Sequence, residues 1–342
     1  MECLSNKIGR VYEPGKVDFL ERTVNKPKGN EVLIKIKSSS ICGSDLHIFK
    51  GKHPSAPLPA TIGHEFSGEV LEIGDKVKNI AAGDRVTVEP CIVCGECVAC
   101  RTGNYGYCEN ITYTYRIGDG AMANYIIALE PYVYKLPDNM SYDEGALIEP
   151  LSVAAHAVRR ADIKLGEKVL VIGGGAIGIL IAALSKRSGA AEVAVVDSND
   201  YRLELALEMG ATHVINRKKE DVLEAVNSLT HGCGMDKSFE CVGVEETFIQ
   251  AMMSIKKNGL ATIVGIFVNP YITIPATRFI THEIRVQGSQ GYCWDFPVAL
   301  SVAGTIPLKK LITHKFPLDK LQEGLETCLD RSKAAVKVII KP

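Results

Sequence analysis

The stretch VLVIGGGAIGILIAALSKRSGAAEVAVVD, residues 169–197, decides the fold of this 342-residue chain. A β-branched apolar run precedes its glycines, a helical pattern follows them, and a second apolar run ends at Asp197. The glycines have the spacing G-x-G-x-x-G, formed by Gly173, Gly175 and Gly178. This order predicts a strand–helix–strand unit whose first turn binds the pyrophosphate of a dinucleotide at the helix N-terminus.

Each residue of this motif has a physical reason. The first glycine permits the tight turn, the second lets the backbone approach the pyrophosphate, and the third lets helix and strand pack closely. Ile177 lies in the same turn and belongs to the expected cofactor site. Asp197 is expected to accept hydrogen bonds from the adenosine ribose and to repel a 2′-phosphate, which predicts NAD rather than NADP. Arg202 either covers the adenine or ribose, or is a solvated charge on the next helix.

The organisation of the chain changes at about residue 152. Before it, short alternating segments bounded by turn residues predict strands at 31–41, 66–74 and 84–90. After it, strand and helix patterns alternate, with a helix expected at about 245–257, which predicts a doubly wound parallel sheet. We therefore expect an α/β protein with a β-rich catalytic domain at 1–151 and 290–342, and a Rossmann cofactor domain at 152–289.

The composition argues against several classes of protein. The chain is 46% hydrophobic and 23% charged, and its formal net charge is −1. This balance gives no reason to expect nucleic acid or an acidic membrane surface as a partner. The first residues, MECLSNKIGRVYEPGKV, lack the apolar core of a signal peptide. A cytoplasmic protein that neither spans nor binds a membrane is expected.

The stretch CGECVACRTGNYGYC, residues 94–108, holds four cysteines with the spacing C-x2-C-x2-C-x7-C. Without a secretory signal, such spacing predicts a tetrahedral zinc site rather than disulfides. Four thiolates would fill every position around the metal, so this zinc is expected to be structural. We call residues 91–108 the cysteine lobe, and its candidate ligands are Cys94, Cys97, Cys100 and Cys108.

Three further segments offer a second set of metal ligands. They are ICGSDLH (41–47), TIGHEFSG (61–68) and GALIEPLSV (145–153). Cys42 and His64 are of the types that zinc favours, and Glu65 and Glu149 are carboxylate candidates. A catalytic zinc keeps three protein ligands and one open position, so this set predicts a catalytic zinc site.

Together these motifs resemble the zinc-containing medium-chain alcohol and polyol dehydrogenases. The motifs C-G-S-D-x-H, G-H-E-x-x-G, the cysteine lobe, E-P-L-S-V, the dinucleotide fingerprint and L-I-T-H-x-F-P-L stand in the family's order. The resemblance implies that the β-rich domain is GroES-like and that Cys42 and His64 bind catalytic zinc. It implies that Glu65 is a ligand or a neighbour of one, and that Glu149 replaces a second cysteine of the alcohol dehydrogenases.

The resemblance also implies a mechanism and a substrate class. It places a proton relay at Ser44 and His47, and backbone contacts to the nicotinamide at Val153, Gly265, Ile266 and Phe267. The expected activity is NAD-dependent oxidation of a secondary alcohol or polyol, with two zincs per chain and a homotetrameric assembly. A sorbitol-like polyol is favoured, although Gly291 and Ile48 differ from the sorbitol enzymes, and a butanediol- or threonine-type substrate is the alternative. A zinc-free reductase or a non-catalytic relative is disfavoured, because every ligand position is present.

Overall fold

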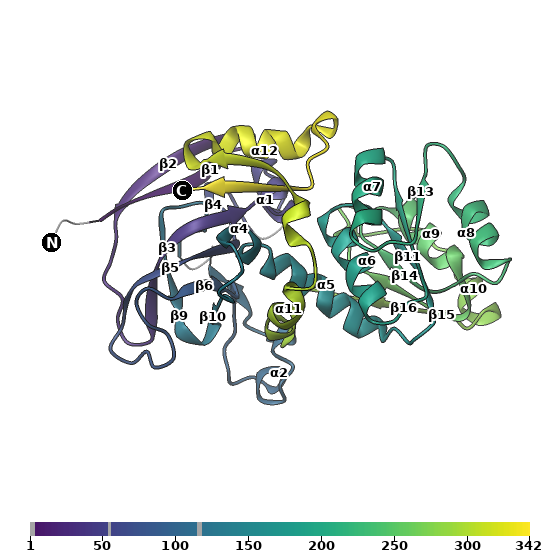
Figure 1. Ribbon diagram of the computed structural model, residues 1–342, viewed down its shortest axis with the longest axis horizontal. Helices are drawn as coiled ribbons and strands as arrows, with labels where there is room; N and C mark the ends of the chain where they lie inside the picture. The colour runs from purple at the N-terminus through teal and green to yellow at the C-terminus, as the bar shows by residue number, and fades with distance from the viewer. Residues whose placement is uncertain (1–3, 54–55, 115–117) are drawn as a thin grey trace. The chain divides into compact units, whose positions relative to one another are not determined.

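The computed structural model describes residues 4–53, 56–114 and 118–342. The chain divides into two compact units (Figure 1). The first contains Met1–Glu149, Ala299–Gly304 and Leu308–Pro342, and the second contains Pro150–Val298 and Thr305–Pro307. Among the described residues, none of the helices combines the length and the apolar character needed to cross a bilayer.

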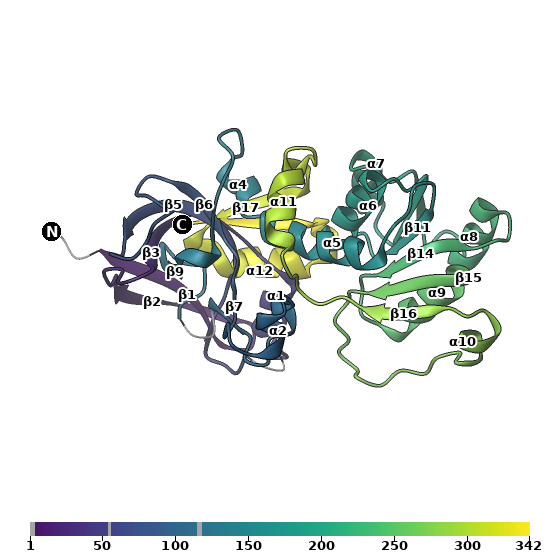
Figure 2. The same cartoon turned by 90° about the horizontal axis from the view of Figure 1, so that it is seen from below.

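The second unit is built on a parallel sheet with the strand order β13-β12-β11-β14-β15-β16, and Figure 2 shows several of these strands side by side. Its strands are β11 (Lys168–Ile172), β12 (Glu192–Asp197), β13 (His213–Asn216), β14 (Met235–Glu240), β15 (Ile255–Ile263) and β16 (Arg285–Gly288). The order reverses between β11 and β14, as in a doubly wound fold, where ligands bind outside the carboxyl ends of the strands. The predicted Rossmann-type sheet is confirmed.

Helices alternate with these strands. They are α5 (Ile148–Ala161), α6 (Ala176–Arg187), α7 (Asp200–Glu208), α8 (Val222–Thr230), α9 (Glu245–Ser254), α10 (Thr277–Thr281) and α11 (Asp295–Ala303). The helix expected at 245–257 ends at Ser254, so its predicted end was wrong. Ile255 is extended, is 1% exposed and pairs with Met235. Burial in the sheet therefore overrides the helical pattern at this point.

The first unit is rich in antiparallel strands. One sheet has the order β10-β6-β5-β3-β18-β17 with β9 also on β3, a second has the order β2-β1-β4, and β7 pairs with β8. The strands are β1 (Ser5–Glu13), β2 (Lys16–Thr23), β3 (Glu31–Ser40), β4 (Ala60–Thr61), β5 (Glu65–Ile73), β6 (Arg85–Val88), β7 (Cys91–Ile92), β8 (Thr112–Tyr113), β9 (Tyr125–Leu129), β10 (Val133–Lys135), β17 (Ile312–Pro317) and β18 (Lys337–Lys341). Alternating residues of β3, β5 and β6 supply a buried core that includes Ile34, Phe66 and Val86.

Short helices complete this unit. In the part of the unit that the structure describes, the α-helices are α1 (Gly43–Phe49), α2 (Val98–Arg101), α4 (Tyr142–Gly145) and α12 (Leu321–Leu329), and the 3-10 helices are η1 (Tyr105–Tyr107), η2 (Glu130–Tyr132), η3 (Leu308–Leu311), η4 (Leu318–Lys320) and η5 (Arg331–Lys333). The last strand, β18, pairs with the end of β3 through Ile339 and Ser40. This pairing brings the C-terminal segment beside the residues that lead into α1.

Candidate functional site

The cysteine lobe gathers four thiols in one place. The sulfur atoms of Cys94, Cys97, Cys100 and Cys108 all lie within 4.8 Å of one another. The surroundings shift the pKa values of two of these thiols in opposite directions. Hydrogen bonds from the backbone N–H groups of Cys100 and Glu109 lower the pKa of Cys97 to about 6, whereas burial raises the pKa of Cys100 to about 12. Four sulfur donors this close match a closed zinc site.

A buried carboxylate, Glu89, joins the lobe to the sheet. Glu89 is 2% exposed and accepts hydrogen bonds from the hydroxyls of Tyr105 (2.8 Å), inside the lobe, and Tyr134 (3.1 Å), on β10. The backbone N–H of Val93 donates to the hydroxyl of Tyr132 at 3.1 Å. The lobe is thus attached to its unit by polar contacts as well as by its own chain.

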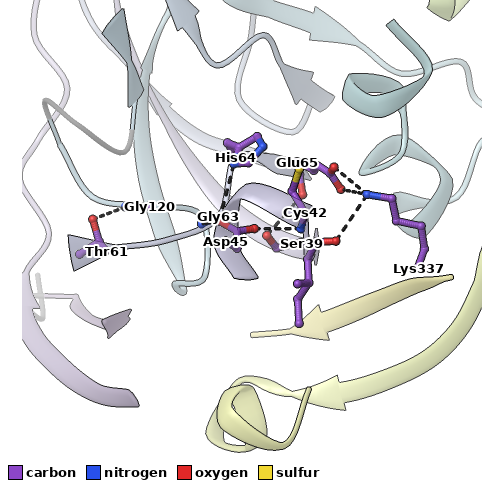
Figure 3. Close-up of polar contacts among 10 residues, drawn as sticks. Ser39, Cys42, Asp45, Thr61, Gly63, His64, Glu65, Gly120 and Lys337 are labelled. Atoms are coloured by element: carbon purple, nitrogen blue, oxygen red, sulfur yellow. Dashed lines mark hydrogen bonds and ion pairs between the residues drawn. The ribbon is translucent and has the colours of Figure 1, made fainter. Parts of the chain in front are cut away.

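A second group of donors lies at the start of α1 and β5. The ligand atoms of Cys42, His64 and Glu65 lie within 4.8 Å of one another, and Figure 3 shows the three side chains converging. We call these three residues the open cluster. Cys42 is the N-cap of α1, and Glu65 is the first residue of β5. A sulfur, an imidazole nitrogen and a carboxylate oxygen form a donor set that suits zinc.

Asp45 is a buried carboxylate that contacts residues of the open cluster (Figure 3). It is 1% exposed, accepts from the N–H groups of Cys42 (2.9 Å) and Gly63 (3.0 Å), and lies 3.8 Å from Nδ1 of His64. Burial alone would lower the pKa of His64, but the negative charges of Cys42 and Asp45 hold it well above its usual value. A carboxylate behind a metal-binding histidine orients the ring and raises its basicity. Asp45 was not predicted from the sequence, although it lies only three residues after Cys42.

Lys337 is the second residue that the sequence analysis missed. It lies on β18, is 4% exposed, and its Nζ contacts both carboxylate oxygens of Glu65 at 2.6 and 2.5 Å (Figure 3). Burial alone would lower the pKa of Lys337, but Glu65 and Cys42 keep it raised. A lysine inside the apolar segment AVKVII was the available signal. A metal bound at the open cluster would therefore compete with Lys337 for the carboxylate of Glu65.

The remaining candidates of this unit lie close by. Ser44 and His47 are three residues apart on α1, and Ser44 Oγ is buried with no hydrogen-bond partner among the described residues. Burial, helped by Lys50 and Lys52, lowers the pKa of His47. Glu149 is 7% exposed in the first turn of α5, and its negative charge acts on His64. It is not within the 4.8 Å grouping of the open cluster.

The glycine-rich turn lies at the carboxyl end of β11 in the second unit. Gly173 has a φ of 109°, and a Cβ on Gly178 would lie 1.8 Å from the carbonyl oxygen of Gly173. The space around Gly175, the N-cap of α6, is open. Asp197 lies beside this turn, where its carboxylate accepts from Gly174 N at 2.7 Å. The geometry leaves backbone N–H groups and a carboxylate at one edge of the sheet.

The other cofactor candidates occupy several elements of the second unit. Ile177 lies in the first turn of α6, Arg202 is half-buried on α7, and Val153 is half-buried on α5. Gly265, Ile266 and Phe267 follow β15, and the ring of Phe267 packs edge-to-face on Phe248. The candidates after β15 lie on the other side of β11 from Asp197, because β14 and β15 follow β11 in the strand order.

Comparisons with known proteins match both halves of the chain. Residues 28–138 match the family described as the alcohol dehydrogenase GroES-like domain, and residues 176–303 match the zinc-binding dehydrogenase family. The chain is 33% identical to D-arabitol-phosphate dehydrogenase of Enterococcus avium, with 95% of this chain and 94% of that protein covered. It is 34% identical to sorbitol dehydrogenase of Bacillus subtilis (92% and 90% covered). It is 38% identical to L-threonine 3-dehydrogenase of Caldanaerobacter subterraneus (95% and 96% covered).

Solved structures of dehydrogenases match this chain over nearly its full length. The fold matches 2R,3R-butanediol dehydrogenase from Bacillus subtilis with a TM-score of 0.91 and 34% identity, covering 99% of this chain and 100% of that one. It also matches a protein from Sinorhizobium meliloti 1021, described as a zinc-binding dehydrogenase bound to NADP, with a TM-score of 0.93 and 30% identity (99% and 100% covered). These relatives differ in substrate while sharing the fold over nearly its full length.

Proposed function

Because this chain belongs to the zinc-containing medium-chain alcohol and polyol dehydrogenases, we propose that it oxidises a secondary alcohol or polyol by hydride transfer to NAD. The observation that carries the proposal is the open cluster, in which Cys42, His64 and Glu65 converge within 4.8 Å. The cluster stands apart from a second donor set made only of cysteines. The two donor sets fit one reactive and one structural zinc site.

The side chains of the first unit fit this chemistry. Cys42 and His64 would hold the catalytic zinc, with Glu65 or Glu149 as a further ligand, and the four lobe cysteines would hold the second zinc. When bound, the catalytic zinc supplies a Lewis acid that lowers the pKa of the substrate hydroxyl. Ser44 Oγ is buried two residues after Cys42 and has no hydrogen-bond partner within the described part of the chain, which makes it a fitting acceptor for that hydroxyl's proton.

His47 would carry the proton onward from Ser44. It lies one helical turn along α1, and residues three apart lie on one helix face. Its lowered pKa keeps the imidazole neutral near pH 7, so it is ready to accept a proton and release it to solvent. Ser44 and His47 would thus take the proton of the alcohol to solvent, and NAD, when bound, would accept the hydride.

The cofactor proposal rests on Asp197. Its carboxylate stands at the end of β12 beside the glycine-rich turn, where it would accept the ribose hydroxyls and repel a 2′-phosphate. A similar structure was solved with NADP, so the preference needs a direct test. The ratio of kcat/KM for NAD over NADP should exceed one, and a ratio below one would refute the assignment.

The substrate proposal is a sorbitol-like polyol, with the butanediol or threonine type as the alternative. The relatives include enzymes for sorbitol, D-arabitol phosphate, L-threonine and 2R,3R-butanediol. We further propose a cytoplasmic homotetramer, because the sheet edge at β16 would be protected by a partner chain. Light scattering that reports a stable monomer would remove the assembly proposal.

A substrate screen tests the proposed function. The purified zinc-loaded protein is mixed with NAD and with sorbitol, D-arabitol, D-arabitol phosphate, 2R,3R-butanediol or L-threonine, and NADH absorbance is followed. We expect turnover with at least one polyol that is abolished in Cys42→Ser. No NADH formation with any alcohol, together with no NADH binding in a fluorescence titration, would contradict the proposal.

A further inference from the structure

Glu240, the last residue of β14, is a completely buried carboxylate that none of the steps above uses. It is 0% exposed. Its Oε1 accepts three hydrogen bonds, from the N–H groups of Val242 and Gly243 at 2.8 Å each and from the hydroxyl of Thr247 at 2.7 Å. One oxygen therefore fixes the turn after β14 and the first residues of α9.

The backbone of the same residue fixes the loop after β15. The carbonyl oxygen of Glu240 accepts from the N–H groups of Val264 (2.8 Å) and Gly265 (3.0 Å). A Cβ on Gly265 would lie 2.4 Å from Gly243 N and 2.6 Å from Oε2 of Glu240. A Cβ on Gly243 would likewise lie 2.3 Å from the carbonyl oxygen of Ile266. The two loops pack backbone against backbone, so they have little freedom to shift independently.

The turn after β14 also contacts the glycine-rich turn. The N–H of Cys241 donates to Ile172 O at 2.9 Å, and a Cβ on Gly173 would lie 2.9 Å from the side chain of Val242. Around this point Val242, Val244 and Ile266 leave 45%, 45% and 66% of their surface exposed. An apolar surface therefore borders the carboxyl ends of β14 and β15, next to the turn expected to hold the pyrophosphate.

The second oxygen of Glu240 carries an energetic cost. Oε2 is buried and has no hydrogen-bond partner among the described residues. Burying a carboxylate with one oxygen unsatisfied is unfavourable, and a neutral side chain would avoid that penalty. The carboxylate offsets this cost by holding the turn after β14 in place, because a charged acceptor binds several N–H and O–H donors more strongly than a neutral one.

We propose that Glu240 is a positioning residue for the nicotinamide half of the cofactor. It does so by locking residues 240–244 against residues 264–266. The adenosine half is expected at β11 and β12, so in a doubly wound sheet the other half of a dinucleotide lies over β14 and β15. Glu240 does not touch the cofactor, and it acts through the backbone of the two loops. This inference rests on the proposed function, because it requires a dinucleotide in this crevice.

The test compares two ligands that share the adenosine half. NADH and ADP-ribose, which lacks the nicotinamide, are titrated by calorimetry into the wild type, Glu240→Gln and the control Ser238→Ala. Ser238 lies on the same strand and is 0% exposed, and its hydroxyl donates to Ala251 O on α9 rather than to either loop. We expect Glu240→Gln to lower the affinity for NADH about tenfold, because the three hydrogen bonds to Oε1 lose the charge of their acceptor. ADP-ribose affinity should be unchanged, as should both affinities in Ser238→Ala.

A second variant keeps the test valid if Glu240→Gln folds poorly. Thr247→Val removes one donor to Oε1. It should lower the affinity for NADH by less than tenfold and leave the affinity for ADP-ribose unchanged. An equal loss of affinity for NADH and ADP-ribose, or an unchanged affinity for NADH in both variants, would overturn the proposal. A wild type that binds neither ligand would instead overturn the proposed function itself.

Discussion

The cysteine lobe and the open cluster are two donor sets in the same structural unit, and they are built in different ways. The lobe draws four sulfur atoms from one continuous stretch, residues 94–108. The open cluster draws a sulfur, a nitrogen and an oxygen from two segments, around Cys42 and around His64 and Glu65. The lobe offers a complete tetrahedral set, whereas the open cluster leaves room for another ligand.

The electrostatic surroundings of the two sets differ in the same way. In the lobe, nearby backbone N–H groups lower the pKa of Cys94 and Cys97. In the open cluster, the charged groups come from other elements: Asp45 stands behind His64, and Lys337 pairs with Glu65. The closed set is therefore specified by one local stretch, whereas the open cluster depends on charges that the fold brings from other elements.

Replacing Cys42 should have the largest effect on activity. Cys42→Ser removes the sulfur ligand of the open cluster, so we expect kcat/KM to fall by about a thousandfold or more, since a metal Lewis acid contributes several kcal/mol to catalysis. The lobe should keep its zinc, giving about one metal per chain by elemental analysis. Near-normal turnover, or loss of both metals together, would break the distinction between the two sites.

Replacing Cys100 should affect stability instead. Cys100→Ser removes one of four thiolates, and the loss of a structural zinc should lower the melting temperature by roughly 10 °C. Cys233→Ser, which changes an exposed cysteine outside both sets, is the matched control and should melt like the wild type. If Cys100→Ser keeps both zincs and its melting temperature, the lobe is not a structural metal site.

Replacing Glu149 tests whether this residue is a further metal ligand of the open cluster. If Glu149 binds the metal, Glu149→Ala should lose catalytic zinc and activity together. If it acts only from nearby, the zinc should stay with affinity lowered about 10–100-fold, and the pH–rate profile should move to lower pH because a negative charge is gone. Full metal, an unchanged pH profile and normal kcat/KM would show that Glu149 has no part in the site.

Replacing Lys337 should have the smallest effect. Lys337→Met frees Glu65 and removes a buried positive charge, so zinc release from the open cluster to a chelator should slow by about threefold to tenfold. Lys337→Arg keeps the ion pair and should release zinc at the wild-type rate. Faster release in Lys337→Met than in Lys337→Arg would show that the lysine supports metal binding rather than opposing it.

The two sites also differ in how far the sequence could predict them. The spacing of Cys94, Cys97, Cys100 and Cys108 indicates a shared metal by itself, because short loops must bring these residues together. The doubly wound sheet was predictable for the same reason, since its periodic strands and its glycine-rich turn are local signals. The ligand types of the open cluster could be proposed from the sequence, but no local spacing joins its segments, and the family resemblance supported their grouping.

Long-range contacts explain what the sequence did not show. Lys337 and Glu65 are separated by 272 positions, and the pairing of both β18 and β5 with β3 brings them together. The end of α9 at Ser254 was missed for a related reason, because Ile255 is recruited into the sheet by Met235. Such features depend on tertiary packing, which no local pattern records.

Stepwise removal of metal tests whether the chain holds one reactive and one structural zinc. The fully metallated protein is dialysed against increasing concentrations of a chelator, and zinc content, NADH formation and melting temperature are measured at each step. We predict two zincs per chain at the start, loss of activity with the first zinc removed, and loss of thermal stability with the second. One zinc or none in a fully active protein would contradict the account.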